Sequence, residues 1–84
     1  MAEPTHELFH ELADPASAAI RLLVVAWGLK GRIAFRNVAY PEAAAELERR
    51  GGVGVPSLWD GHRLHVGDAP VRAELARLAA RPPG

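Results

Sequence analysis

The sequence contains no cysteine, and this absence excludes a large part of protein chemistry. Without thiols the chain has no disulfide, no thiolate nucleophile and no cysteine ligand for a metal ion. Redox catalysis by cysteine is therefore excluded. The usual clue to an oxidising or reducing compartment is missing for the same reason.

Net charge and long apolar runs are lacking as well. Ten acidic and ten basic side chains cancel, so no global field steers the protein to nucleic acid or to an anionic membrane. The longest apolar run, residues 22–27, is too short to span a bilayer, and no signal peptide is recognisable. We expect a cytoplasmic protein with neither nucleic acid nor a membrane as partner.

What is present suits one small globular domain. The chain has 84 residues, of which 49% are hydrophobic, enough for a modest core and too few for two domains. We expect a single domain over residues 1–84, with its core at about 6–80 and tails at 1–5 and 81–84.

Three helices are predicted from start signals and apolar spacing. Asp14 followed by Pro15 is a typical helix start, and Ile20, Leu23, Val24 and Trp27 then recur on one helical face. Leu22 and Val25 widen that face, so we expect this helix to be well buried and to end at Gly28 or Gly31. Pro41 opens a second helix over 42–50. A third follows Gly67-Asp68, with Val71, Leu75 and Leu78 on one face.

Strands are predicted between these helices. Residues 32–38 alternate in polarity, residues 53–59 form an extended segment interrupted by Pro56, and 62–66 return after Asp60-Gly61, a strong two-residue hairpin signal. Residues 6–12 could be strand or helix, and strand is favoured. A helical crossover makes the first two strands parallel. The result is an α/β domain with a four-stranded mixed sheet flanked by three helices.

This order resembles the thioredoxin-like fold in its short, glutaredoxin form. Asp14, Pro15 and Ser17 fall where that family carries its Cys-Pro-x-Cys motif, Val55-Pro56 resembles its cis-proline segment, and Gly67-Asp68 resembles its glutathione-contacting turn. Residues 55–71 also resemble the amino-terminal domain of glutathione transferases. The resemblance implies a cis bond before Pro56, with backbone groups beside it that pair with glutathione or an extended peptide.

The departure from the family lies at the reactive positions. Asp14 and Ser17 stand where the two cysteines would be, so the resemblance implies an inherited fold without the inherited reaction. The leading hypothesis is a non-redox binding or adaptor module whose degenerate active site comprises Asp14, Pro15, Ser17, Val55, Pro56 and Asp68. We expect no catalytic residue, no metal ligand and no cofactor, and a protein partner or a homodimer.

Three alternatives remain open. A glutathione-type thiol ligand could be bound, or even used in transferase chemistry, with Ser17 donating to its thiolate and Asp68 holding its amino group. Residues 6–10 read HELFH, the H-E-x-x-H signature of zinc hydrolases, which requires a helix so that His6 and His10 share one ion. His10 with Asp14 and Ser17 matches the residue types of a hydrolase triad.

Each of these residues also has a simpler interpretation. Asp14 is expected to cap the first helix with Ser17 in its first turn, and Asp68 to be the N-cap of the last helix. His62 and His65 flank the hairpin and are expected to face solvent. Trp27 is expected in the core, and Trp59 to be partly exposed beside the hairpin.

Overall fold

A computed structural model describes residues 3–81, so the outermost parts of the two predicted tails lie outside it. The elements follow in the order β1 (His6–His10), α1 (Pro15–Ala26), the short 3₁₀ helix η1 (Lys30–Arg32), β2 (Ile33–Asn37), α2 (Pro41–Arg49), β3 (Ser57–Trp59), β4 (Leu64–Val66) and α3 (Asp68–Ala79). The α/β class and the three helices are as predicted. Residues 6–10, left open between two states, are a strand.

The four strands form one mixed sheet in the order β2-β1-β3-β4. β1 pairs in parallel with β2 and antiparallel with β3, and β4 is antiparallel to β3. This is the layout expected of a thioredoxin-like domain, and it makes β1 a central strand. The parallel pair needs the crossover that α1 supplies.

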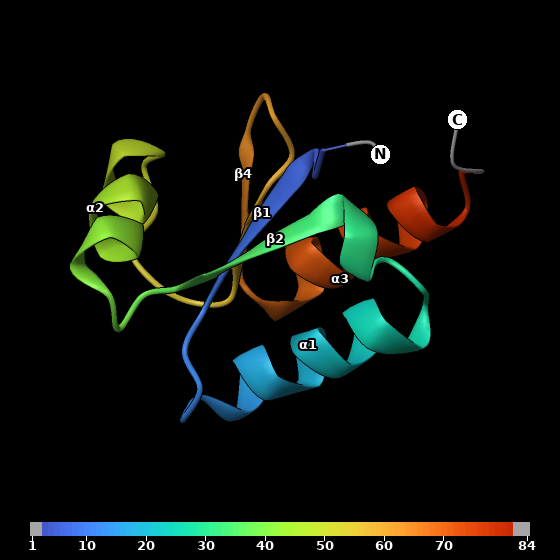
Figure 1. Ribbon diagram of the computed structural model, residues 1–84, viewed down its shortest axis with the longest axis horizontal. Coiled ribbons are helices and arrows are strands. Elements are labelled where there is room, and N and C mark those ends of the chain that lie inside the picture. The colour runs from blue at the N-terminus through green and yellow to red at the C-terminus, as the bar shows by residue number, and fades with distance from the viewer. Residues whose placement is uncertain (1–2, 82–84) are drawn as a thin grey trace.

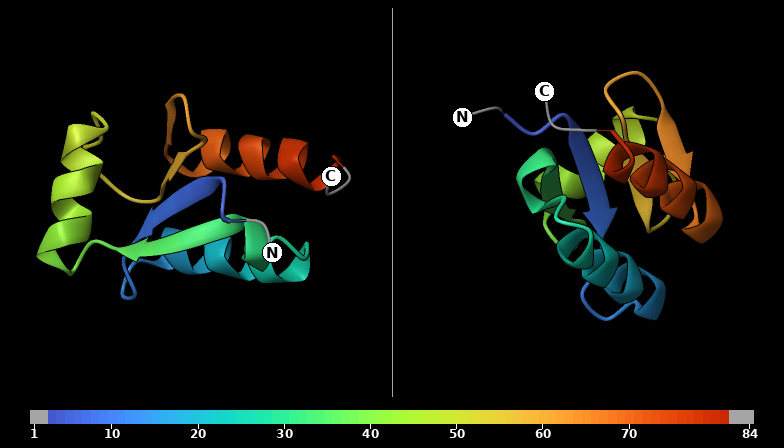
Figure 2. Two further views of the ribbon diagram at one scale, coloured as in Figure 1. Left: turned by 45° about the horizontal axis from the view of Figure 1, so that its top comes forward. Right: turned by 90° about the vertical axis from the view of Figure 1, so that its right-hand side faces the viewer.

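Helices α1 and α3 share one face of the sheet, and α2 covers part of the other (Figure 1). α1 and α3 lie side by side and run in the same direction, as both views of Figure 2 show. Their buried side chains meet those of the sheet in one apolar cluster: Leu8, Ile20, Val24, Leu29, Ile33, Leu58, Val71, Leu75 and Leu78. Burying each such side chain contributes about 1.5–3 kcal/mol before conformational entropy is counted.

Strand alternation decides what each face carries. His6, Leu8 and His10 point toward α1 and α3, and Glu7 and Phe9 point toward α2, because successive side chains of a strand alternate. On the second face Arg50, at the end of α2, pairs with Glu7 at 3.0 Å and lies over the ring of Trp59 at 4.2 Å. These contacts fix α2 against the sheet.

Helix α1 differs from the prediction in how deeply it is buried. Ile20 and Val24 are fully buried, but Trp27 is 42% exposed, and Leu22 and Val25 are 71% and 61% exposed. The sheet and α3 cover only one side of α1, so the side chains that widen its apolar face stay largely exposed. The expectation of a well-buried helix with Trp27 in the core is wrong.

Two boundaries also move. The hairpin turn is centred on Gly61 and His62, one residue later than predicted, because the Asp60 amide donates to the Arg63 carbonyl at 3.1 Å and closes the turn. β3 is confined to three residues, since the segment before Pro56 does not pair with the sheet. No helix in residues 3–81 has the length and apolarity needed to cross a membrane.

Candidate functional site

The first turn of α1 is held by Asp14 as its N-cap. Asp14 has extended backbone angles, and its carboxylate accepts from the Ser17 amide and from the Ser17 hydroxyl, both at 2.8 Å. Pro15, exposed at the surface, occupies the first helical position. The capping interpretation of Asp14 and Ser17 is confirmed.

Ser17 is fully buried, which limits what it can do. Its oxygen donates to Asp14 and accepts from the Glu11 amide at 3.3 Å. Donation to a ligand thiolate would require breaking the Asp14 bond and opening the helix end. The arrangement serves the local fold.

The segment leading into β3 carries a cis peptide bond between Val55 and Pro56, as the resemblance implied. Pro56 is buried, its carbonyl accepts from the Gly67 amide at 3.0 Å, and the Ser57 hydroxyl donates to the Gly54 carbonyl at 2.7 Å. Val55 between them is half-buried. Within residues 3–81, neither its amide nor its carbonyl has a hydrogen-bond partner.

A groove of about 530 Å³ lies along this segment. One wall is the loop 52–55 and the other is α2, and the end of β1 and the residue after β2 complete it. Its lining side chains are mainly apolar, apart from two glutamates: Glu11, Val38, Ala44, Leu47, Glu48, Val53 and Val55. In this groove the backbone of Val55, which has no hydrogen-bond partner in residues 3–81, therefore lies beside an apolar surface.

Asp68 lies at the same end of the sheet but does not line the groove. Gly67 is the N-cap residue of α3, with no side-chain capping bond, and Asp68 is the first helical residue. Its carboxylate accepts from Arg72 Nε at 2.8 Å. The prediction that Asp68 caps the helix is therefore wrong by one position, since Gly67, at φ 93°, takes the backbone conformation that ends the loop.

No hydrogen bond joins His10 to Ser17 in the described part of the chain, so the triad is not assembled. His10 is buried and its Nδ1 lies 3.1 Å from an Arg21 nitrogen. Burial, and next the Arg21 charge, lower the pKa of His10. Arginine only donates, so Nδ1 accepts, and the imidazole is neutral in the folded protein at pH 7.

The HELFH segment does not form the predicted zinc pair. His6 and His10 are the two ends of strand β1, and four residues of strand span about 13 Å. Zinc–nitrogen bonds are only about 2 Å long. The hydrolase signature therefore fails on secondary structure.

A polar cluster that no sequence pattern indicated lies at the other end of the sheet. His6, Asp60, His65 and Glu74 come from β1, the hairpin turn, β4 and α3, and we call them the histidine–carboxylate cluster. Nε2 of His6 lies 2.9 Å from a Glu74 oxygen, and Nε2 of His65 lies 2.8 Å from Asp60 Oδ2 and 3.8 Å from the second Glu74 oxygen. Little of these side chains is exposed, from 4% for Glu74 to 14% for Asp60.

Both carboxyl groups in the cluster are held ionised. Hydrogen bonds from Arg77 lower the pKa of Glu74 to about 2, against the opposing effect of burial and with help from His6. Burial would raise the pKa of Asp60, but the Arg63 and His62 amides and the His65 side chain outweigh it and hold the pKa well below its usual range. The expectation that His65 faces solvent is wrong, whereas His62 is exposed as predicted. The contact between His6 and Glu74 joins residues 68 positions apart, so it leaves no local signal in the sequence.

Comparisons with protein-family models, curated proteins and solved structures find no match for this chain.

Proposed function

We propose that the protein is a non-catalytic binding module that holds an extended peptide segment of a protein partner in the groove beside Val55. The absence of cysteine removes the thiol chemistry of the family that its layout resembles. The burial of Ser17 leaves that position without an accessible nucleophile. What remains at this end of the sheet is a surface suited to binding.

The free backbone of Val55 carries the proposal. An extended peptide that lies against an exposed backbone segment gains main-chain hydrogen bonds, and pockets for its side chains add specificity. Val55 offers one donor and one acceptor without partners among the described residues. Leu47, Val38 and Val53 beside it offer the apolar surface for a side chain.

The charges of the groove favour a basic partner. Glu11 and Glu48 line it, and no lysine or arginine does. An anionic ligand such as glutathione, which carries two carboxylates and one amine at neutral pH, would be repelled. A peptide with a lysine or arginine beside an apolar residue complements both features of the groove.

The test uses linear seven-residue peptides selected from a phage-displayed library on the immobilised protein, followed by NMR titration of the labelled protein. We expect the selected peptides to combine a basic with an apolar residue. The amide chemical-shift changes that these peptides cause in the protein should cluster at residues 53–55 and 44–48. Reduced glutathione, titrated in parallel, should not change the chemical shifts of these amides.

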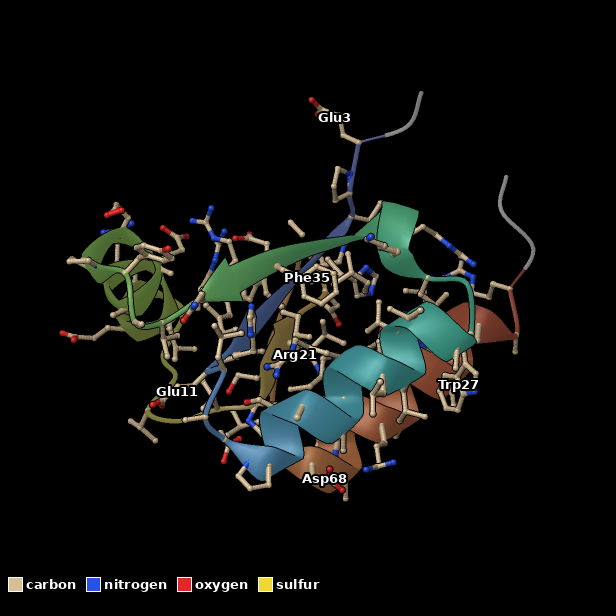
Figure 3. All side chains as sticks on the ribbon, turned by 60° about the horizontal axis from the view of Figure 1, so that its bottom comes forward. Glu3, Glu11, Arg21, Trp27, Phe35 and Asp68 are labelled. Carbon is tan, nitrogen blue, oxygen red and sulfur yellow. The ribbon has the colours of Figure 1, made fainter. Side chains whose placement is uncertain are left out.

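Matched variants make the test specific. Glu11 and Glu3 are both exposed glutamates, and they lie beyond opposite ends of β1 (Figure 3). Glu11→Lys should weaken peptide binding about two- to fivefold, the usual worth of one exposed charge pair, and Glu3→Lys should not. Val53→Ser should weaken binding more than Val25→Ser, although Val25 is also exposed.

Three outcomes would contradict the proposal. Equal effects of the two lysine variants would show that the groove is not the site. Shifts with glutathione at residues 53–55 would favour a small thiol ligand. Shifts that depend on protein concentration without any peptide would favour a homodimer.

A further inference from the structure

The histidine–carboxylate cluster gathers metal-binding atoms from distant parts of the chain. The candidate ligand atoms, one each from Asp60, His65 and Glu74, lie within 4.8 Å of one another. Their closest separations are 2.8 Å and 3.8 Å. Two ligands of a tetrahedral zinc ion, each bonded at about 2 Å, lie roughly 3.3 Å apart. Shifts of less than about 1 Å would therefore bring these atoms around one ion.

The geometry points to a zinc site with Asp60, His65 and Glu74 as ligands. Imidazole and carboxylate together suit zinc, whereas magnesium and calcium take oxygen ligands. Zinc binding would replace the Asp60–His65 hydrogen bond by bonds from both side chains to the ion. Any proton on His65 Nε2 would pass to solvent.

The surroundings already hold these ligands in orientation. The second carboxylate oxygen of Asp60 accepts from the amides of His62 and Arg63, each at 2.8 Å, which leaves Oδ2 directed at His65. His6 contacts the Glu74 oxygen that lies away from His65, and its own Nδ1 is 2.8 Å from the Thr5 hydroxyl. Outer contacts of this kind are what orient the ligands of metal sites.

The charge of the cluster leaves room for a cation. Asp60 and Glu74 are both nearly buried, and Arg77 is the one permanently charged cation among their partners in residues 3–81. Together the two carboxylates and the Arg77 guanidinium carry one net negative charge. Half of the Arg77 side chain is exposed, so it can turn toward solvent when an ion takes the Glu74 oxygen.

A metal here would also stabilise a small domain that has no disulfide. The ligands join the hairpin turn and β4 to α3, which are separate elements of the fold. Small domains commonly use a structural metal where the core alone is marginal. Zinc that binds only the folded state raises the unfolding temperature by mass action.

The test is a zinc titration of the purified full chain after removal of metal with a chelator, by calorimetry and by thermal unfolding. We expect one zinc ion per chain and a rise in the unfolding temperature. His65→Gln should weaken zinc binding at least tenfold, since loss of even an outer-shell partner costs about 10–100-fold. His62→Gln, which changes an exposed histidine of the same turn, should leave affinity within about twofold, well below that effect.

Arg77→Gln separates a metal site from a purely structural hydrogen-bond network. Arg77 competes with zinc for Glu74, so this variant should bind zinc as tightly as the parent or more tightly, although it loses its own ion pair. If His65→Gln does not fold, the ¹⁵N shift of the His65 Nε2 atom in the parent protein reports zinc coordination directly. No binding at a large excess of zinc, or equal losses in His62→Gln and His65→Gln, would overturn the assignment.

Discussion

The two histidines of β1 occupy matched positions with opposite surroundings. His6 and His10 begin and end the strand, point to the same face, and are each 5% exposed. His6 meets the carboxylate of Glu74, whereas His10 meets the guanidinium of Arg21. Residue type and burial are the same, so the two rings differ in the charge of the side chain that each contacts. At the His6 end every carboxylate oxygen of Asp60 and Glu74 has a hydrogen-bond partner. At the His10 end the backbone groups of Val55, which have no hydrogen-bond partner in residues 3–81, lie beside the groove.

Among substitutions at the two ends of β1, we expect Glu74→Ala to have the largest effect on the free energy of unfolding. Glu74→Ala would leave His6 without its buried partner and Arg77 without its ion pair. Breaking a buried pair costs about 3–5 kcal/mol; because Arg77 is half exposed, we expect a loss of about 2–3 kcal/mol in the free energy of unfolding. Urea unfolding in the presence of a chelator measures it.

Glu48→Gln, which changes an exposed glutamate of α2, is the control for Glu74→Ala. It should alter the free energy of unfolding by less than about 0.5 kcal/mol. A loss at Glu74 no larger than this would mean that the cluster adds nothing to stability and that its burial is incidental.

A smaller effect is expected at the other end, where Asp14 caps α1. Asp14→Ala removes the acceptor of the Ser17 amide and leaves the buried Ser17 hydroxyl without its acceptor, so we expect a loss of about 1–2 kcal/mol. Ser17→Ala keeps the capping bond to the amide and should cost less. A double-mutant cycle in urea gives their coupling, and a cycle without coupling would contradict the hydrogen bond from the Ser17 hydroxyl to Asp14.

The smallest effect is a pH dependence carried by His10. Its pKa is lowered in the folded protein, so from about pH 6.5 downward, near the ordinary histidine pKa, the unfolded chain binds a proton that the folded chain resists. Stability is therefore unaffected above that pH and falls as the pH drops through the window below it. Urea unfolding of the parent and of His10→Gln between pH 7 and 5 isolates this contribution.

Arg21→Gln sharpens the same prediction. It removes the second cause of the shift and leaves burial, so the His10 pKa should rise toward its ordinary value without reaching it. An NMR titration of the imidazole measures this. An unchanged pKa would mean that the Arg21 contact does not persist in solution.

Local signals predicted the parts of the fold that depend on neighbouring residues. Asp14-Pro15 marks the start of α1 because capping and a fixed proline φ act within one turn, and Gly28, at φ 70°, follows its end. Val71, Leu75 and Leu78 are buried on α3 as their spacing indicated. The order of these elements was enough to predict a four-stranded mixed sheet with its first two strands parallel and its last two antiparallel.

The sequence could not show which side of a helix or strand the rest of the domain packs against, and the burial of several side chains depends on this. Leu22 and Val25 satisfy the helical pattern of α1 but remain largely exposed, since only one side of α1 packs against the domain. His65 looks like a surface residue of a hairpin until α3 is placed across it. His6 and Glu74 are 68 positions apart, and no spacing rule connects them.

The central position of β1 has a consequence for how the chain forms during synthesis. One edge of β1 pairs with β2 and the other with β3, where Glu7 stands opposite Trp59. During synthesis β2, the partner of the first edge, emerges from the ribosome well before β3, the partner of the second. Until the β3–β4 hairpin emerges, the nascent chain presents an unpaired strand edge, the feature that makes partly folded intermediates prone to aggregate. The last third of the chain therefore closes a sheet that its first strand began.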